Sequence, residues 1–488
     1  MDFVIKGHGL EHAVQTIIQV FCPNEGYRRL EEIPLTGRAI CSGFESGLYY
    51  ADLYEEGKIM ASGRAAPSGE GKKAHTIAVA AAIFYAWEKH LGYRPPWGTL
   101  TGVRPAKIIT EEISKGQSAE AAAAYLREAY LVREDKANLC VRVARAELEF
   151  IANSDPAGVG VYIGIPFCPS RCGYCSFTSY PLKTFGALVE PYMEALFKEI
   201  DFLGEQLKCS KITALYIGGG TPGVLEPRVL DNLLRVIRLK FPGDYELTFE
   251  GGRPDVICRD KLLISKKYGV TRLAINPQTM VDYTLNKAGR EHTAEDFKRA
   301  YAQAGQMGFT NINCDVILGL PGEGRASAAF TFSELKKFAP ASLTVHTLAL
   351  KRAAAFNHSY GRYMGSGPID HAVNHVIAVN HVIEDMLEIA RESCEEMGLR
   401  PYYMYRQKNM IGNHENVGYA RPGFESLYNH MTMTEARSVY AAGAGAVTKI
   451  VYPAANLIKR AFNVKSLEEY ISRVDEMIDR KRMLLNGV

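Results

Sequence analysis

The sequence has little net charge and no long apolar run. Its 57 basic and 54 acidic residues give a formal net charge of +3. A chain this close to neutral lacks the basic excess by which nucleic-acid-binding proteins contact phosphates. No uninterrupted apolar run reaches the length of a membrane span. We therefore expect neither a nucleic-acid partner nor a membrane.

The first residues also lack the features of a secretory signal peptide. Asp2 is acidic, and no basic segment followed by an apolar core comes after it. The 10 cysteines lack the dense, regular spacing of a secreted disulfide scaffold. These absences predict a cytoplasmic protein whose thiolates stay available to a metal.

The length of the chain, 488 residues, exceeds that of one ordinary domain, and size statistics predict two or three. We predict an N-terminal α/β domain of unknown role at 1–152, because the turn-rich segment 153–158 follows it. The pattern then changes to parallel βα units at 159–390. A mixed α/β region that covers the substrate is predicted at 391–488.

Six short apolar runs in the second region predict strands separated by helices. This rhythm suits a partial (β/α)6 barrel. An open doubly wound sheet is the alternative, but a phosphate-binding glycine loop would then follow the first strand, where a cysteine loop stands instead. In both folds functional groups gather at the carboxyl ends of the strands. The runs are 161–166, 214–218, 246–250, 272–276, 311–318 and 342–350.

Two further segments carry local patterns. Residues 93–107 contain three prolines and gather Trp97 with basic side chains. This mixture could bind an anion, but we favour packing of the tryptophan as its role. Near the C-terminus one apolar stripe predicts a docking helix, formed by Tyr470, Ile471, Val474, Met477 and Ile478.

The most informative residues are Cys168, Cys172 and Cys175, which form a CxxxCxxC loop directly after the first predicted strand. An electron-carrying cubane or a structural zinc site usually takes four protein ligands, so three thiolates leave one metal position open. The other seven cysteines are scattered singly. A zinc loop or a redox pair is the alternative.

With Tyr174 before its third cysteine, this loop resembles that of the radical S-adenosylmethionine (SAM) enzymes. In that superfamily the open iron of a 4Fe-4S cluster chelates the amino and carboxylate groups of SAM. Reductive cleavage then yields methionine and a 5′-deoxyadenosyl radical. The resemblance implies both cofactors, with Cys168, Cys172 and Cys175 as the metal ligands.

Unusual residues mark the ends of the other predicted strands. Glycines after the second strand let the backbone approach a ligand closely, and this element resembles the GGxTP sequence that holds the SAM amino group. A carboxylate ending the third strand can accept hydrogen bonds from ribose hydroxyls. The residues are Gly219, Gly220, Thr221, Glu250, Gln278, Arg290 and Asp315.

The order of the motifs IPFC, IGGGTP, NPQ, GREHT and DVILGLPGE is similar to that of the oxygen-independent coproporphyrinogen III oxidases. The similarity covers 159–350 and extends more faintly to 423–426; the N-terminal extension and 344–352 look most like the Gram-positive branch. It implies SAM contacts by Gly219, Gly220, Thr221, Glu250, Gln278 and Asp315. It also implies catalytic roles for Tyr162, near the methionyl group, and Arg290, paired with the SAM carboxylate.

This resemblance implies oxidative decarboxylation of coproporphyrinogen III, a tetrapyrrole, to protoporphyrinogen IX. The electron donor and acceptor stay open. A tetra-anionic substrate needs cationic anchors, for which the candidates are Lys351, Arg352, Arg406 and Lys408.

One position departs from the oxidases. The oxidases carry a further cysteine two positions after the third, where this chain has Phe177. The haem-chaperone and haem-degrading branches likewise lack that cysteine. The chaperone's His-Asn and Tyr-Trp element is absent too, since 427–431 reads LYNHM. A haem-binding chaperone, or another radical reaction on a tetrapyrrole such as methyl transfer with ring opening, is therefore the alternative.

Overall fold

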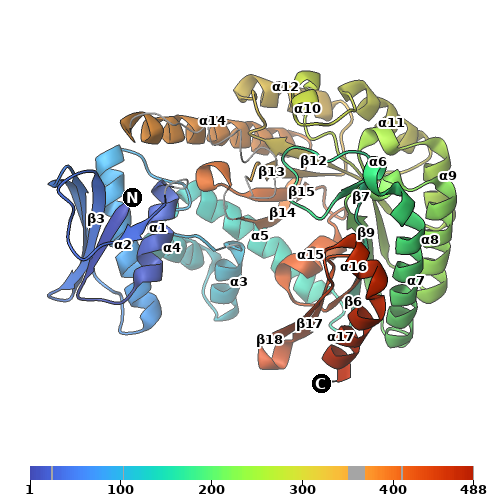
Figure 1. The fold of residues 1–488 in the computed structure, drawn as a ribbon, viewed down its shortest axis with the longest axis horizontal. Helices are drawn as coiled ribbons and strands as arrows, with labels where there is room; N and C mark the ends of the chain where they lie inside the picture. The colour runs from blue at the N-terminus through green and yellow to red at the C-terminus, as the bar shows by residue number, and fades with distance from the viewer. Residues whose placement is uncertain (23–25, 103, 350–368, 408–409, 487–488) are drawn as a thin grey trace. The chain divides into compact units, whose positions relative to one another are not determined.

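Two large β-sheets organise the chain, one of five strands and one of eleven (Figure 1). The computed structural model describes residues 1–22, 26–102, 104–349, 369–407 and 410–486. Two compact units result. Unit 1 comprises Met1–Arg145, His358–Val382 and Tyr405–Glu415, and unit 2 comprises Ala146–Asn357, Ile383–Met404 and Asn416–Val488.

Unit 1 contains the five-stranded sheet, in the order β2-β1-β3-β4-β5. β4 and β5 form a hairpin with Glu56 and Gly57 at its turn, both at positive φ. The strands are β1 (Asp2–Lys6), β2 (Arg28–Arg29), β3 (Arg38–Glu45), β4 (Leu48–Glu55) and β5 (Lys58–Ala65). The helices are α1 (Glu11–Phe21), α2 (Lys72–Leu91), α3 (Ala106–Ser114) and α4 (Ala119–Tyr130), and α5 (Glu134–Asn153) begins in unit 1 and ends in unit 2.

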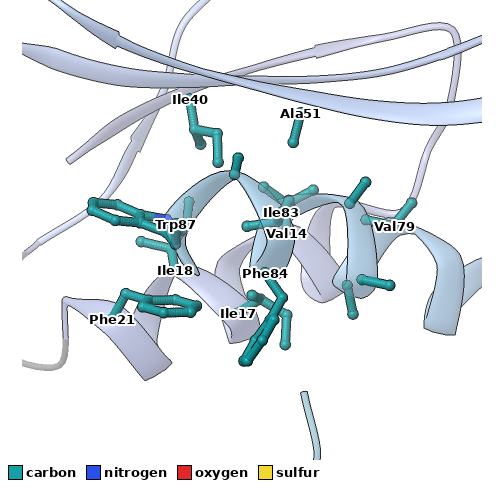
Figure 2. Packing of buried hydrophobic residues seen from close by; sticks show 14 of the residues in the cluster. Val14, Ile17, Ile18, Phe21, Ile40, Ala51, Val79, Ile83, Phe84 and Trp87 are labelled. Atoms are coloured by element: carbon teal, nitrogen blue, oxygen red, sulfur yellow. The ribbon is translucent and has the colours of Figure 1, made fainter. Parts of the chain in front are cut away.

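The core of unit 1 lies between this sheet and helices α1 and α2 (Figure 2). The rings of Phe21 and Trp87 stack with their centroids 5.5 Å apart. The alanines of α2 allow a close approach to the sheet: a Cβ on Gly63 would lie 2.1 Å from the carbonyl oxygen of Ala82. Small residues on both elements therefore set the spacing between helix and sheet.

The irregular segment 93–107 has the packing role that we favoured. Trp97 is fully buried, and its Nε1 donates a 2.8 Å hydrogen bond to the Glu415 carboxylate. Arg406 lies over the Trp97 ring, is 2% exposed, and donates to the carbonyl oxygen of Asn413. The prediction that Arg406 anchors the substrate is wrong, because its guanidinium is buried and bound within unit 1.

Unit 2 contains the eleven-stranded sheet, in the order β14-β15-β13-β12-β11-β10-β9-β6-β16-β17-β18. The six strands from β6 to β13 in this row pair in parallel and overlap the six predicted runs. Figure 1 shows α7, α8, α9 and α11 along the outer side of their curve, so the predicted partial barrel is confirmed. The strands are β6 (Val159–Ile165), β9 (Ile212–Gly219), β10 (Glu246–Gly252), β11 (Arg272–Ile275), β12 (Ile312–Leu318) and β13 (Ser342–Thr347).

Helices alternate with these strands, as the βα rhythm requires. They are α6 (Leu182–Phe185), α7 (Val189–Gln206), α8 (Pro227–Lys240), α9 (Arg259–Lys267), α10 (Asp282–Lys287), α11 (Ala294–Gln306) and α12 (Arg325–Lys336). The side chain of Thr293 accepts from the backbone N–H of Asp296 and begins α11 with a capping box.

The C-terminal part of the chain extends both ends of the parallel row. β16 pairs in parallel with β6, which therefore lies between β9 and β16, and β15 pairs antiparallel with β13. The strands are β14 (Arg400–Tyr405), β15 (Asn416–Ala420), β16 (Val439–Ala442), β17 (Val447–Tyr452) and β18 (Leu457–Phe462). The helices are α14 (Ile369–Glu396), α15 (Leu427–Thr434), α16 (Leu467–Ser472) and α17 (Val474–Asn486).

The predicted C-terminal docking helix is present as two helices, because α16 and α17 are separated at Arg473. Its apolar stripe is confirmed: Tyr470, Val474 and Met477 are buried, and both helices contact α7. Within the described ranges, no helix has the length and apolar character that a membrane crossing requires.

Candidate functional site

The cysteine loop leaves the carboxyl end of β6. Two short strands, β7 (Phe167–Cys168) and β8 (Tyr180–Pro181), pair at the two ends of the loop and close its base. Cys168 is buried, whereas Cys172 and Cys175 are half-buried. The loop therefore presents three thiols at the edge where the parallel strands end.

The surroundings of the thiols suit metal ligation. Burial raises the pKa of the Cys168 thiol to about 12, and the Thr221 hydroxyl donates to its sulfur over 3.4 Å. A buried thiolate needs a compensating cation, which a bound metal supplies. No three His, Cys, Asp or Glu side chains converge on a single-ion position in the described part of the chain. A 4Fe-4S cluster does not need one, since each cysteine bonds a different iron.

The glycine run at the end of β9, Gly218 to Gly220, lies against this loop. A Cβ on Gly220 would lie 2.9 Å from the Cys168 sulfur, and one on Gly218 would lie 2.7 Å from Oε2 of Glu250. Gly219 has φ of +123°, a conformation that favours glycine. The run therefore joins the cysteine loop to Glu250 without any intervening side chain.

Glu250 at the carboxyl end of β10 is held in a low-polarity environment. Burial, and then the negative charge of Asp315, raises the pKa of the Glu250 carboxyl to about 8. The Tyr216 hydroxyl donates to its Oε2 over 3.3 Å. At neutral pH Glu250 is therefore mostly protonated in the cofactor-free protein and can donate as well as accept a hydrogen bond.

This raised pKa predicts how stability changes with pH. Because folded Glu250 binds a proton that the unfolded chain has lost, its contribution is complete below about pH 4.5 and is lost as the pH rises through about 8. We expect Glu250→Gln to reduce the loss of stability between pH 4.5 and 8 and to raise the Tm of the cofactor-free protein at pH 8. Each kcal/mol gained corresponds to roughly 2–4 °C. Thermal unfolding between pH 5 and 9 checks this, with exposed Glu205→Gln as the control; equal pH profiles would contradict it.

Three stacked tyrosines lie one layer below Glu250. Tyr162 and Tyr216 face each other across β6 and β9 with their rings 14° apart, and Tyr428 stacks on both, at centroid distances of 6.0 and 4.8 Å. Sequence reasoning missed Tyr216 and Tyr428. The faint similarity at 423–426 was the signal for Tyr428, because that segment stands just before the start of α15, which carries Tyr428.

The N-terminus of α15 is fixed to the barrel by one carboxylate. Glu246 of β10 accepts from the Ser426 hydroxyl and from the backbone N–H groups of Leu427 and Tyr428, at 3.0 to 3.3 Å. A carboxylate is favourable at a helix N-terminus, where backbone donors lack partners. Glu246 therefore places Tyr428 against Tyr162.

Asp315 and Gln278 lie on the other side of the same edge. Asp315 accepts from the Asn313 amide over 2.8 Å and lies 3.8 Å from Nε2 of His346, and these neighbours help to lower the pKa of its carboxyl despite burial. Gln278 has φ of +67° and is 8% exposed. Within the described residues its buried Oε1 has no hydrogen-bond partner. Such an orphaned acceptor indicates a ligand that brings a donor.

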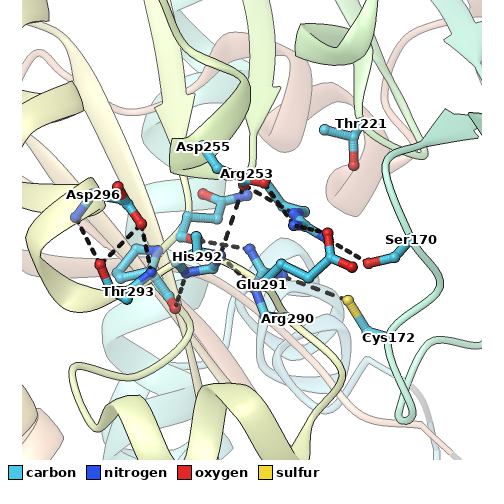
Figure 3. Close-up of polar contacts among 12 residues, drawn as sticks. Ser170, Cys172, Thr221, Arg253, Asp255, Arg290, Glu291, His292, Thr293 and Asp296 are labelled. Atoms are coloured by element: carbon cyan, nitrogen blue, oxygen red, sulfur yellow. Dashed lines mark hydrogen bonds and ion pairs between the residues drawn. The ribbon is translucent and has the colours of Figure 1, made fainter.

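Arg290 connects this side to the cysteine loop (Figure 3). It is 6% exposed, and its Nη1 donates to the Tyr174 hydroxyl over 2.8 Å and approaches the Cys172 sulfur at 3.9 Å. Its Nη2 donates to the carbonyl oxygen of Asn276. The predicted SAM-carboxylate partner is thus also a direct neighbour of a cysteine ligand.

All the predicted site residues therefore meet at one edge of the barrel, except for the substrate anchors. Lys351, Arg352 and Lys408 lie outside the described residues.

Comparison with known proteins first gives the class. The family model of the Radical SAM superfamily matches residues 162–333. The oxygen-independent coproporphyrinogen-III oxidase-like protein HemZ of Bacillus subtilis (strain 168) is 37% identical over 408 residues, which cover 82% of this chain and 79% of that protein. This chain belongs to the family of oxygen-independent coproporphyrinogen-III oxidase-like proteins, within the radical SAM superfamily.

Two further proteins are similar to this chain. The haem chaperone HemW of Bacillus subtilis (strain 168) is 28% identical over 317 residues, covering 64% of this chain and 76% of that protein. The structure of coproporphyrinogen III oxidase (HemN) from Escherichia coli has a TM-score of 0.51 and 22% identity, covering 68% of this chain and 73% of that one. The latter likeness shows the fold.

Radical SAM proteins use a 4Fe-4S cluster and SAM, and the residues of this site fit both groups. Three thiols on one loop supply soft ligands for iron, and they leave the fourth position open. The glycine run provides a surface without side chains, while the protonated Glu250 and the orphaned Gln278 oxygen offer polar contacts to a nucleoside.

Proposed function

We propose that this protein binds a 4Fe-4S cluster and SAM and catalyses oxidative decarboxylation of coproporphyrinogen III, a tetrapyrrole, to protoporphyrinogen IX. One observation carries the proposal: the cysteine loop, the glycine run and the unsatisfied Gln278 oxygen converge at the carboxyl ends of one set of parallel strands. The similarity to the HemZ protein supports the choice of reaction.

Each group of residues has a proposed role. The thiolates of Cys168, Cys172 and Cys175 hold the cluster. SAM contacts the surface formed by Tyr162, Gly219, Gly220, Thr221, Glu250, Gln278 and Asp315, with Arg290 toward its carboxylate. The Thr221 hydroxyl also bonds the Cys168 sulfur, which ties the cluster side of the site to the SAM side.

When bound, the two cofactors supply a carbon radical that can take a hydrogen atom. Conversion of one propionate side chain into vinyl removes one hydrogen atom, one electron and carbon dioxide, so an electron acceptor must be present. The protein's own part is to orient groups and to exclude water. The stacked Tyr162, Tyr216 and Tyr428 line the site below Glu250 with aromatic rings.

An anaerobic assay tests this function. Reconstituted protein is given coproporphyrinogen III, a reductant, SAM and an electron acceptor, and the products are analysed by mass spectrometry. We expect deoxyadenosine together with the vinyl product. Cleavage of SAM without loss of carbon dioxide from the substrate would contradict the reaction while leaving the cofactor assignment in place.

A haem chaperone is the second candidate, and Phe177 favours it. This side chain is 68% exposed beside the cysteine loop, at the position where the oxidases have a cysteine. The HemW relatives support the same alternative. Stoichiometric haem binding without substrate-dependent deoxyadenosine would favour a chaperone over an oxidase.

A further inference from the structure

The cysteine loop depends on tertiary contacts for its position. Between β7 and β8 it forms only turns and bends, in which the backbone N–H of Cys175 bonds the carbonyl oxygen of Cys172. Its other backbone bond, from Gly173 to the carbonyl oxygen of Ala288, reaches the segment after α10. A loop with so few internal bonds needs side-chain anchors to hold three thiolates in place.

Arg253, which follows β10, supplies such an anchor (Figure 3). It is 2% exposed, and its Nε and Nη2 donate to the two carboxylate oxygens of Asp255 at 2.9 and 2.6 Å. Its Nη1 donates to the Ser170 hydroxyl at 2.6 Å. Ser170 stands between the first two cysteines of the loop, so this bond reaches the middle of the CxxxC segment.

The direction of these bonds fixes the Ser170 hydroxyl. A guanidinium only donates, so Ser170 must accept from Arg253 and direct its own proton elsewhere. The carbonyl oxygen of Gly289 lies 3.2 Å away and accepts it. Ser170 is therefore bound on both sides, by the segment after β10 and by the segment after α10.

Two buried arginines, Arg253 and Arg290, lie beside the loop, and they differ in whether a carboxylate pairs with the guanidinium. Arg253 forms a bidentate pair with Asp255, so that pair is neutral as a whole. Arg290 instead donates to Tyr174, to the Asn276 carbonyl and to His292, whose pKa burial lowers to about 4, and it approaches the Cys172 sulfur at 3.9 Å. Arg253 therefore anchors the loop without adding a net positive charge beside it.

We propose that Arg253 is a positioning residue which, through Ser170, fixes the backbone between Cys168 and Cys172 so that the thiolates keep their places before and after the cluster binds. The loop is held by Arg253 in the cofactor-free protein too. The role of Arg253 toward the cluster rests on the proposed function.

The first test uses amide hydrogen exchange of residues 169–176 in the cofactor-free protein. We expect Arg253→Lys and Ser170→Ala each to raise exchange about tenfold, the value of one lost hydrogen bond to a charged group. Lysine keeps the charge but cannot bond Asp255 in a bidentate manner and reach Ser170 as well. Because both changes remove the bond between Arg253 and Ser170, the double variant should exchange clearly less than the product of the two single effects predicts.

A matched control is Arg238→Lys, since Arg238 likewise bonds loop carbonyl oxygens, those of Tyr268 and Gly269, but not the cysteine loop. It should leave exchange at 169–176 unchanged. Wild-type exchange in Ser170→Ala, or a double variant whose effect is the product of the two single effects, would overturn the proposal. The Ser170→Ala result decides even where a change at buried Arg253 prevents folding.

The second test uses the reconstituted protein. Iron release to a chelator should be roughly tenfold faster in Arg253→Lys and Ser170→Ala, while the midpoint potential stays at the wild-type value, because no net charge is removed. Wild-type rates of iron release would contradict the role toward the cluster. If wild-type protein binds no cluster at all, the proposed function fails, whereas the exchange experiment still decides the role of Arg253.

Discussion

Replacing Cys172 by alanine is expected to abolish cluster binding and to reduce deoxyadenosine formation to background. Cys172 is half-buried, lies 3.9 Å from the Arg290 guanidinium and stands in the middle of the three-cysteine loop. With one of only three protein ligands removed, a second iron loses its protein ligand and the cluster is exposed to solvent. Iron and sulfide content after anaerobic reconstitution, together with SAM cleavage under reducing conditions, provide the measurement.

The matched control is Cys209→Ala, because Cys209 is an exposed cysteine of the same unit outside the loop. It should retain wild-type iron content and SAM cleavage. Equal loss in both variants would point to general damage by cysteine replacement. Full iron content in Cys172→Ala would disprove the assignment of the loop as the cluster site.

The largest expected effect on stability comes from Lys481→Met in α17. Lys481 and Glu199 of α7 form an ion pair in which both side chains are at most 1% exposed. Glu199 also accepts from the Tyr470 hydroxyl and from the backbone N–H of Gly443, at 2.6 and 2.8 Å. Removing the lysine leaves a buried carboxylate without its cation, which costs about 3–5 kcal/mol.

This pair also supports the site. Gly443 follows β16, the strand that pairs with β6, and the Tyr192 hydroxyl of α7 donates to the carbonyl oxygen of Gly164 in β6 itself. The network around Glu199 thus holds the strand that carries Tyr162 and leads into the cysteine loop. We expect the Lys481→Met variant to lose SAM affinity as well as stability.

Urea unfolding of the full chain, followed by circular dichroism, measures the loss of stability. Lys198→Met is the control, because Lys198 forms an exposed pair with Asp475 across the same two helices and should change stability by less than about 1 kcal/mol. Adding Glu199→Gln to Lys481→Met should recover part of the loss, since it removes the unpaired charge. If Lys481→Met lowered stability no more than Lys198→Met does, the buried pair of Lys481 and Glu199 would not stabilise the fold as proposed.

Predictions from local pattern were accurate where one element could be identified by itself. All six predicted apolar runs overlap parallel strands of the structure. The cysteine spacing predicted the site because ligands on one loop need no long-range packing to be close together. The prediction of one continuous helix over 470–478 was wrong only at Arg473, where a short break separates α16 from α17.

Predictions failed or were missing where a residue's partner is distant in the sequence. Arg406 carries the positive charge that a substrate anchor needs. Only its position over the Trp97 ring shows that it packs inside the protein instead. Arg253 and Ser170 are separated in the sequence by three α-helices and three strands, and no spacing rule connects them. Tyr428 stacks on Tyr162 only because the Glu246 carboxylate accepts hydrogen bonds from the N-terminus of α15.

The sequence by itself determined the class of protein, the parallel βα rhythm and the three candidate cluster ligands, because periodicity and short spacings are local properties of a chain. The tertiary structure alone decided what surrounds those ligands: the C-terminal strand beside β6, the tyrosine stack below Glu250 and the two arginines beside the loop. These depend on which faces pack together, and burial then sets their charge states, as in the raised pKa of Glu250.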